Sequence, residues 1–326
     1  MATGRLYFHS PCFDGVASAV LAWDFLEERE GWETPVFRPV SYDVRQTWLE
    51  TSLGRPAAVV DFLYHPDAGF WADHHLTTFL TTRAREDFEQ PARTDRLLIY
   101  DQHADSCAGL LWRRLAHDFG HRNARYAELV QWAEKIDAAR YVSVEEAIAS
   151  SAPALRLSLG FALGQTEHYV ETLVRELRTK PLEVVADLPE PSNRFKRARD
   201  LVELGLDHFK RSAHLESDGI VVFDVDGQGA IISRYAPYRF FPDARYSAGI
   251  VRWPGGARIT AMRNPWREFP SVPLGRLAEA LGGGGHERVG SIVVRGDRVA
   301  EAPSILTRLL GGIREAEKSA PRRPVA

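Results

Sequence analysis

The sequence predicts an α/β protein with an N-terminal, mostly parallel sheet flanked by helices, a helical connector and a smaller C-terminal α/β domain. Two observations support this prediction. Short apolar runs alternate with stretches whose apolar residues recur every three or four positions, which is typical of strands alternating with helices. Several of these runs are continuously apolar, as in parallel strands that are covered on both faces. A length of 326 residues is enough for two domains, each with its own core.

The N-terminal domain is expected over residues 1–150. A first strand at Arg5–His9 leads into a helix that starts near Asp14, and later helices are expected at about Asp105–His117 and Ala124–Ile136. The remaining strands expected in this domain are Pro35–Val40, Ala57–Phe62, Gly69–Ala72 and Leu97–Tyr100.

Residues 151–215 are expected to form the helical connector. Helical periodicity covers about Val144–Arg178, and Asn193 is a candidate N-cap of a long amphipathic helix. The C-terminal domain is expected over residues 216–312, and residues 313–326 are expected to be a disordered tail. The elements expected in this domain are strands at Ile220–Phe223, Ala230–Ile232, Gly249–Trp253, Arg258–Arg263 and Ser291–Arg295, and a helix over Leu274–Leu281.

The composition is that of a globular protein, with 44% hydrophobic and 26% charged residues. No apolar run approaches the ~18 residues that a membrane-spanning helix needs. The N-terminus lacks the apolar core of a signal peptide, and the two cysteines, Cys12 and Cys107, give no disulfide framework. We therefore expect a cytoplasmic protein without a membrane partner.

Charge differs between the two parts of the chain. Residues 1–217 hold 33 acidic against 25 basic residues, whereas residues 218–326 hold 11 acidic against 16 basic residues. An acidic first part suits cation binding, and a basic second part suits an anionic substrate, although such charge is also common on solvated surfaces.

Potential metal ligands follow several of the predicted strands. Open α/β sheets bind ligands at the carboxyl ends of their strands, where these side chains are expected to meet. Each has a structural alternative, because Asp14 is also explained as an N-cap, His9 as a buried histidine, and the Asp73-His74-His75 triplet as a solvated loop. Three apolar strands that each end in a ligand are harder to explain by packing. The candidates are His9, Asp14, Asp61, Asp73, His74, His75 and, beyond a helix, Asp137.

Carboxylate and imidazole ligands without thiolates favour a hard-to-borderline divalent cation. Asp61, on a central strand, is placed to bridge two ions about 3.5–4 Å apart, as in two-metal hydrolases. We therefore expect two divalent metal ions, with Mn²⁺ favoured and Mg²⁺, Zn²⁺ or Fe²⁺ as alternatives.

A run of four glycines precedes His286 in the C-terminal domain. Residues without Cβ let backbone N–H groups approach an anion closely, and His286 adds a donor at the same place. The alternative is a flexible loop after a helix. The sequence thus predicts an anion-binding loop that includes Gly284, Gly285 and His286.

These motifs resemble those of the DHH phosphoesterase superfamily. The pattern His9-x4-Asp14, Asp61, the Asp73-His74-His75 triplet and Asp137 is similar to its four motifs. The glycine run with His286, and Arg263 on a preceding strand, resemble the substrate-binding motif of the associated DHHA1 domain. The superfamily contains oligoribonucleases (nano-RNases), adenosine bisphosphate phosphatases, cyclic-dinucleotide phosphodiesterases, single-strand DNA exonucleases, exopolyphosphatases and pyrophosphatases. A small C-terminal DHHA1 domain fits the first three best.

The resemblance implies a role for each matched residue. One metal ion would be held by Asp14, Asp61, His74 and Asp137, and the other by His9 and Asp61. His75 would face the phosphoryl oxygens and Asp73 would orient the neighbouring histidine, so these two are the catalytic residues. The substrate phosphate would be held by Arg263, Gly284, Gly285 and His286.

Cys12 departs from the superfamily pattern, which has an acid at this position. A thiolate can bind Zn²⁺ or Fe²⁺ but is a poor ligand for Mn²⁺ or Mg²⁺. Whether Cys12 is a ligand is therefore left open, and so is the preferred metal of the His9 site.

The leading interpretation is a divalent-metal-dependent phosphoesterase that hydrolyses short nucleotide phosphate esters by in-line attack of metal-bound hydroxide. Short oligonucleotides, nucleoside bisphosphates and linear or cyclic dinucleotides are the expected substrates, and no stable complex with duplex nucleic acid is expected. The alternatives are an exopolyphosphatase-like hydrolase and a catalytically degenerate nucleotide-binding protein. A homodimer is left open.

Overall fold

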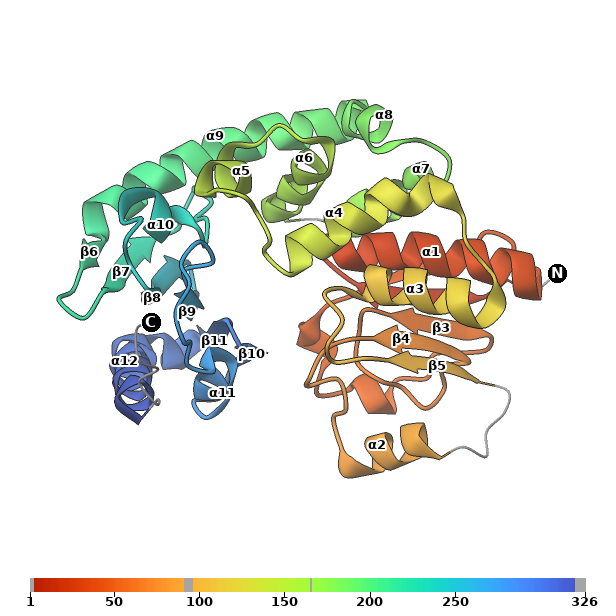
Figure 1. The fold of residues 1–326 in the computed structure, drawn as a ribbon, viewed down its shortest axis with the longest axis horizontal. Helices are drawn as coiled ribbons and strands as arrows, with labels where there is room; N and C mark the ends of the chain where they lie inside the picture. The colour runs from red at the N-terminus through yellow and green to blue at the C-terminus, as the bar shows by residue number, and fades with distance from the viewer. Residues whose placement is uncertain (1–2, 91–95, 165, 320–326) are drawn as a thin grey trace. The chain divides into compact units, whose positions relative to one another are not determined.

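The computed structural model describes residues 3–90, 96–164 and 166–319. The chain divides into two compact units (Figure 1). Unit 1 comprises Met1–Arg140 and Ser151–Lys196, and unit 2 comprises Tyr141–Ser150 and Arg197–Ala326. No helix in these described ranges is long and apolar enough to cross a membrane.

Five strands form the sheet of unit 1, in the order β2-β1-β3-β4-β5. They are β1 (Arg5–His9), β2 (Val36–Val40), β3 (Ala57–Val60), β4 (Phe70–Asp73) and β5 (Leu97–Tyr100). Every neighbouring pair is parallel, so all carboxyl ends lie at one edge of the sheet. All residues of β3 and β4 are buried. The predicted parallel sheet with both faces covered is therefore confirmed.

Both faces of this sheet carry a hydrophobic core. Leu6 and Phe8 of β1 point into a core shared with several helices, whereas Tyr7 between them joins a second core that contains Trp48 and Trp71. The α-helices of unit 1 are α1 (Phe13–Glu30), α2 (Thr82–Glu89), α3 (Cys107–Phe119), α4 (Ala127–Asp137), α6 (Pro153–Leu159), α7 (Glu167–Leu177) and α8 (Leu182–Ala186).

The unit boundaries differ from the predicted domain boundaries. Residues 151–196 are part of unit 1 rather than of a separate connector over 151–215. The reason is burial, because α6, α7 and α8 contribute Leu157, Tyr169 and Val185 to the first core of unit 1. Their helical periodicity indicated an apolar face, but it did not indicate which surface that face covers.

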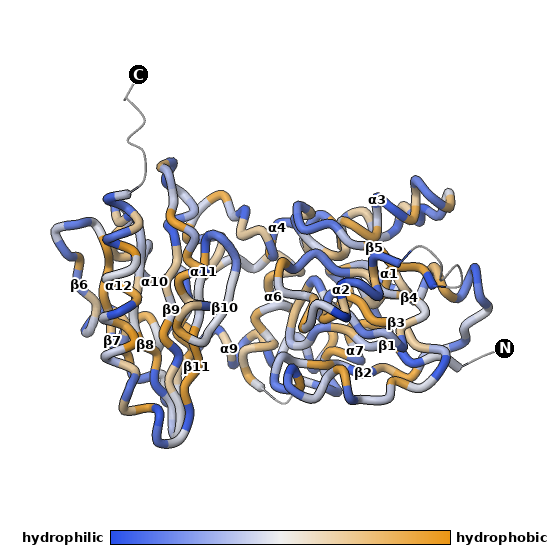
Figure 2. Tube along the Cα trace, turned by 90° about the horizontal axis from the view of Figure 1, so that it is seen from below, coloured by the Kyte–Doolittle hydropathy of each residue, from blue (hydrophilic) through white to orange (hydrophobic). Residues whose placement is uncertain are grey.

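Unit 2 contains a six-stranded mixed sheet in the order β10-β11-β9-β8-β7-β6. Its strands are β6 (His214–Leu215), β7 (Ile220–Asp226), β8 (Tyr246–Trp253), β9 (Gly256–Arg263), β10 (Gly284–His286) and β11 (Val289–Arg295). Its helices are α5 (Val144–Ala149), α10 (Ala236–Phe240), α11 (Leu274–Glu279) and α12 (Ala302–Ser319), while α9 (Pro189–Ser212) begins in unit 1 and ends in unit 2. Apolar residues recur along β9, β11 and α12 (Figure 2), and α11 and α12 share one core with the sheet.

Three local predictions for this part of the chain are wrong. Helix α9 starts at Pro189, so Asn193 lies inside the helix and is not its N-cap. Residues 230–232 form no strand, because the Ile231 N–H donates to the Leu201 carbonyl of α9 instead of to a neighbouring strand.

The predicted tail is also wrong over residues 313–319. These residues complete α12, whose apolar face, including Leu306, Leu309 and Ile313, is buried in the core of unit 2. Residues 320–326 lie outside the described part of the chain.

Gly15 lets the first helix begin directly against the first strand. A Cβ atom at this position would lie 2.1 Å from the carbonyl oxygen of His9, the last residue of β1. Real Cβ atoms do not approach an oxygen so closely, so only glycine fits without movement of the backbone. This close packing sets Asp14 beside the carboxyl end of β1.

We therefore predict that Gly15→Ala lowers the free energy of unfolding by about 1–3 kcal/mol, because the strand and helix must move apart. Gly69→Ala is the matched control in the same unit, since its Cβ would meet nothing closer than 3.7 Å. That variant is expected to stay within about 0.5 kcal/mol of wild type. Urea unfolding of the three proteins measures the difference, and equal stability of all three would contradict this description of Gly15.

Candidate metal centre

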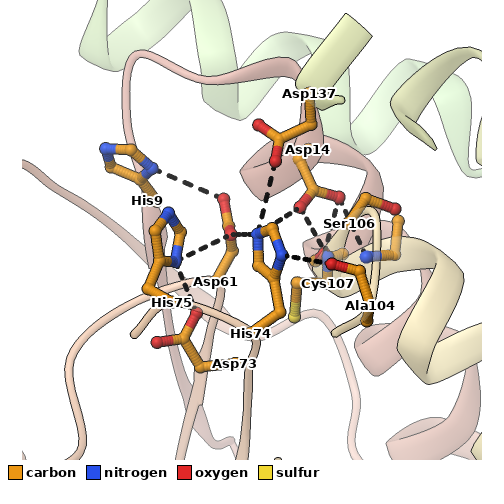
Figure 3. A network of polar contacts seen from close by, with 12 residues as sticks. His9, Asp14, Asp61, Asp73, His74, His75, Ala104, Ser106, Cys107 and Asp137 are labelled. Atoms are coloured by element: carbon orange, nitrogen blue, oxygen red, sulfur yellow. Dashed lines mark hydrogen bonds and ion pairs between the residues drawn. The ribbon is translucent and has the colours of Figure 1, made fainter. Parts of the chain in front are cut away.

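Acidic and histidine side chains gather at the edge of the unit 1 sheet where the parallel strands end (Figure 3). They come from the ends of β1, β3 and β4, from the first turn of α1 and from the last turn of α4. The strand-end prediction is therefore correct in its geometry. The residues brought together are His9, Asp14, Asp61, Asp73, His74, His75 and Asp137.

Asp61 lies in the middle of this group. Its Oδ2 atom is 3.4 Å from Nδ1 of His9. Its Oδ1 atom is 3.7 Å from Nε2 of His74 and 3.8 Å from Nδ1 of His75. One carboxylate thus faces three imidazole rings, and its two oxygens face different histidines, as is suitable for a residue shared between two cation positions.

His74 links Asp61 to the two outer carboxylates. Its Nε2 atom is 3.7 Å from Oδ2 of Asp14 and 3.3 Å from Oδ2 of Asp137. Asp137 is the last residue of α4, where the negative end of the helix dipole disfavours a carboxylate. A cation at this point would offset that repulsion.

Asp73 holds the third histidine. Its Oδ1 atom lies 2.7 Å from Nδ1 of His75, a hydrogen bond that fixes the orientation of the ring. Burial opposes the charged form of His75, but Asp73 and the nearby carboxylates outweigh burial and raise the pKa of His75 to about 9. His75 is therefore positively charged at neutral pH in the absence of other cations.

Three sets of side chains could each contribute ligands to a metal ion. Within each set, one donor atom per residue lies within 4.8 Å of the others. The sets are Asp14, His74 and Asp137; Asp61, His74 and His75; and His9, Cys12 and Asp61. The first is oxygen-rich and suits Mn²⁺ or Mg²⁺, whereas the third contains a sulfur that suits softer ions.

The burial of Asp61 without hydrogen bonds to its carboxylate in the described part of the chain is the best reason to expect a cation at this site. Its side chain is buried, yet no hydrogen bond from the described residues reaches either carboxylate oxygen. Asp61 also has a left-handed backbone, with φ at 55°, which non-glycine residues rarely adopt. Such strain persists where the surrounding structure imposes it, and it is concentrated at functional sites.

The pKa values of the centre indicate that positive charge is needed there. Burial, followed by the charge of Asp14, raises the pKa of Asp61 well above its ordinary value. Burial and the neighbouring His75 lower the pKa of His9 to about 3, so His9 is neutral and can act as a ligand. Divalent cations would remove the mutual repulsion of the carboxylates, and the residues present therefore fit the predicted metals.

Cys12 reaches the same centre from the N-cap position of α1. Its thiol belongs to the set with His9 and Asp61, and its side chain makes no capping hydrogen bond. Burial, and then the charge of Asp61, raise the pKa of the thiol well above its ordinary value. In the absence of a cation the sulfur is therefore protonated, and a metal ion would have to displace that proton in order to bind it.

Two parts of the site were not predicted from the sequence. The ring of Tyr42 packs edge-on against His9, with centroids 5.0 Å apart, and lies 6.3 Å from the ring of His75. The start of α3 contacts Asp14 and His74 through backbone atoms, from Ala104 to Ala108. Tyr42 is not a residue type that marks a metal site. The contacts from segment 104–108 are made by backbone groups, which leave no signal in the sequence.

Arg263 in unit 2 is bound by its own surroundings in the protein. Its side chain is almost fully buried, and its guanidinium donates to the carbonyl oxygens of Asn264 and Phe269. It also stacks over the ring of Phe269 at 4.4 Å. These contacts hold the loop after β9, so a substrate phosphate would have to be bound by the remaining N–H groups of the guanidinium.

The glycine run lies on the edge strand of the same sheet. A Cβ on Gly285 would lie 2.2 Å from the carbonyl oxygen of Val289, and the φ of Gly285 is 147°, so close pairing of β10 with β11 requires glycine. A Cβ on Gly284 would meet nothing within 4 Å, so packing does not explain that glycine. His286 follows on β10 and is exposed, and its predicted role in substrate binding stays a prediction.

Solved structures resemble this chain over nearly its whole length. A pGpG-specific phosphodiesterase, PggH from Vibrio cholerae, aligns with a TM-score of 0.68 at 17% identity, over 97% of this chain and 100% of its own. The DHH domain of a member of the s1p family of ribosomal proteins aligns with a TM-score of 0.57 at 12% identity, over 95% and 86%. The chain has the DHH fold.

RecJ from Thermus thermophilus, in complex with Mn²⁺, shares this DHH fold with a TM-score of 0.56 at 14% identity. The alignment covers 96% of this chain and 52% of RecJ, so the chain spans about half the length of that protein. No protein-family model matches the sequence, and no curated protein matches it. The predicted resemblance is thus confirmed at the level of the fold.

We predict that Asp61→Asn stabilises the metal-free protein. A carboxyl whose pKa is raised by folding destabilises the fold above its unfolded pKa, and asparagine removes that charge while tolerating the left-handed backbone. In EDTA at pH 7 the variant should gain about 1–3 kcal/mol, a difference that disappears below about pH 4. With Mn²⁺ the order should reverse, because the shared ligand is lost.

Thermal melts in EDTA and in excess Mn²⁺ test both halves of this expectation. Wild type should show a large Mn²⁺-induced increase in melting temperature and the variant a small one. A variant that melts below wild type in EDTA would show that the Asp61 charge supports the metal-free fold, contrary to the burial described above.

We also predict that Cys12→Asp increases Mn²⁺ affinity, because it replaces a protonated sulfur beside His9 and Asp61 with a hard anionic oxygen. Cys12→Ser is the control and should change Mn²⁺ affinity little. Titration of metal-free wild type and both variants with Mn²⁺, followed by electron paramagnetic resonance, measures the effect. A folded Asp variant that needs more Mn²⁺ than wild type would mean that the thiol is a packing residue.

Proposed function

We propose that the protein is a divalent-metal-dependent phosphoesterase that hydrolyses short nucleotide phosphate esters. The observation that carries this proposal is the buried, unbonded carboxylate of Asp61 among three imidazole rings at the ends of parallel strands. Two further carboxylates, Asp14 and Asp137, complete an oxygen-rich set beside it. These ligands suit Mn²⁺, with Mg²⁺, Zn²⁺ or Fe²⁺ as alternatives.

In this proposal most of the side chains of the centre bind metal ions, and the ions bind the phosphoryl group. When bound, two divalent ions would activate water and stabilise the negative charge that develops on the phosphoryl oxygens. Asp14, Asp61, His74 and Asp137 would hold one ion, and His9 and Asp61 the other. These residues would bind the two ions and hold them in place while negative charge develops on the phosphoryl oxygens.

His75 is the group that would contact the reacting phosphate. Its Nδ1 donates to Asp73, so Nε2 is the ring atom left to contact the substrate, and it donates there when the ring is protonated. The carboxylate of Asp73 raises the pKa of His75, and a protonated ring would form a stronger hydrogen bond as negative charge develops on the phosphate. The anion-binding role predicted for Gly284, Gly285 and His286 of unit 2 is a separate part of this proposal.

The substrate class is supported by the fold and by charge. PggH, one of the structures with the same fold, is a pGpG-specific phosphodiesterase. The basic balance of residues 218–326, with 16 basic and 11 acidic residues, suits an anionic substrate. We propose short oligonucleotides, linear or cyclic dinucleotides and nucleoside bisphosphates, acted on in the cytoplasm.

A substrate panel with Mn²⁺ tests the proposal. We expect release of mononucleotides from a linear dinucleotide, and loss of that activity by more than about a hundredfold in Asp61→Asn. The variant is also the control for a contaminating phosphodiesterase. The panel contains a linear dinucleotide, a cyclic dinucleotide, a five-nucleotide RNA, adenosine 3′,5′-bisphosphate and inorganic polyphosphate.

Two results would favour other functions. Faster phosphate release from polyphosphate than from any nucleotide would identify an exopolyphosphatase-like enzyme with the same centre. Tight binding of a dinucleotide without hydrolysis in Mn²⁺, Zn²⁺ or Fe²⁺ would identify a degenerate nucleotide-binding protein in which Cys12 has disabled one metal position.

A further inference from the structure

The segment 104–108 contacts two of the proposed metal ligands from outside the group of ligands (Figure 3). The carbonyl oxygen of Ala104 is 3.0 Å from Nδ1 of His74. The backbone N–H of Cys107 donates to Oδ2 of Asp14 at 2.6 Å, and the N–H of Ala108 donates to Oδ1 of Asp14 at 2.9 Å. A single short stretch of chain therefore holds ligands that come from α1 and from the end of β4.

The contact with Asp14 uses the start of α3. Ser106 is the N-cap, and its hydroxyl accepts from the N–H of Gly109. The N–H groups of Cys107 and Ala108 have no partner within the helix, as is general for the first turn. They donate to the two carboxylate oxygens of Asp14, which lies 93 and 94 residues earlier in the sequence. The helix dipole adds a favourable interaction with its negative charge.

The contact with His74 selects a tautomer. A carbonyl oxygen can only accept, so Nδ1 of His74 carries the hydrogen in this bond. Nε2 is then the lone-pair nitrogen, and it is the atom that faces Asp14 and Asp137. A histidine that binds a metal through one ring nitrogen commonly donates from the other in this way.

We propose that segment 104–108 is the positioning element of the metal centre and fixes Asp14 and His74 in a ligating geometry through backbone atoms. Cys107 and Ala108 are positioning residues through their N–H groups, and Ala104 through its carbonyl. This inference rests on the proposed function in one respect, namely that the centre binds a divalent cation. The competing explanation is that Asp14 serves only to cap α3, in which case these bonds support the helix and not the metal.

A proline at position 107 removes one donor and spares the helix. Position 107 is the first helical residue, where proline is favoured because its N–H has no partner in the helix. Ser106 before it is extended, with φ at −161° and ψ at 156°, as a residue before proline should be. Cys107→Ala is the matched control, since it removes the buried thiol and keeps the donor.

The experiment is a Mn²⁺ titration of metal-free wild type, Cys107→Pro and Cys107→Ala, followed by electron paramagnetic resonance. We expect about tenfold weaker Mn²⁺ binding for Cys107→Pro, as is typical when a group that orients a ligand is lost, and affinity within about twofold of wild type for Cys107→Ala. Helix content from circular dichroism should be equal in all three proteins.

Two outcomes would overturn the positioning role. Wild-type affinity in Cys107→Pro would mean that Asp14 only caps α3, and equal losses in both variants would assign the effect to the thiol. Failure of wild type itself to bind any of Mn²⁺, Mg²⁺, Zn²⁺ and Fe²⁺ would instead contradict the proposed function, so the two failures are distinguishable.

Amide hydrogen exchange supplies a test that does not depend on the folding of the proline variant. In metal-free wild type the amides of Cys107 and Ala108 should be protected, although first-turn amides normally exchange fast. Asp14→Ala should accelerate both by at least about tenfold and leave Leu110 unchanged, because its N–H donates within the helix to Ser106. Fast exchange of both amides in wild type would overturn the inference.

Discussion

The burial of the Asp61 charge is the constraint on which the rest of unit 1 depends. A carboxylate that is taken out of water without a hydrogen bond is strongly unfavourable, and here two oxygens are in that condition. The same residue also has a strained backbone. A fold keeps such a residue only if the remaining interactions outweigh this cost, and a bound cation would turn the unfavourable charge into a ligand.

Several features of the fold position the residues that surround Asp61. The parallel order of β1, β3 and β4 sets three strand ends beside one another, and Gly15 lets α1 begin against the first of them. The start of α3 supplies the hydrogen bonds that Asp14 needs, while Asp73 supplies the one that His75 needs. Asp14 and His75 thus have hydrogen bonds from their surroundings, whereas among the described residues neither oxygen of Asp61 has one.

The sequence predicted those parts of the structure that depend on single positions. A parallel sheet brings its carboxyl ends together, so an acid or histidine at the end of an apolar run locates the centre without further knowledge of the fold. Prediction from the sequence failed for features that do not depend on the identity of a single side chain, such as which surface a helix covers. The periodicity of α7 did not show that its apolar face packs into unit 1, and the sequence does not show that Arg263 donates to backbone carbonyls. The backbone contacts of segment 104–108 could not be predicted from the sequence either.

The path of the chain has a consequence for how this protein can be divided. The polypeptide passes from one unit to the other three times, after Arg140, after Ser150 and after Lys196. The insert Tyr141–Ser150 belongs to unit 2, where the carbonyl of Tyr141 accepts from the indole of Trp266. No single cut yields both units intact, since a fragment that begins at Arg197 loses this acceptor. Shuffling of the two units between genes would therefore need three matched junctions, which favours their inheritance as one block.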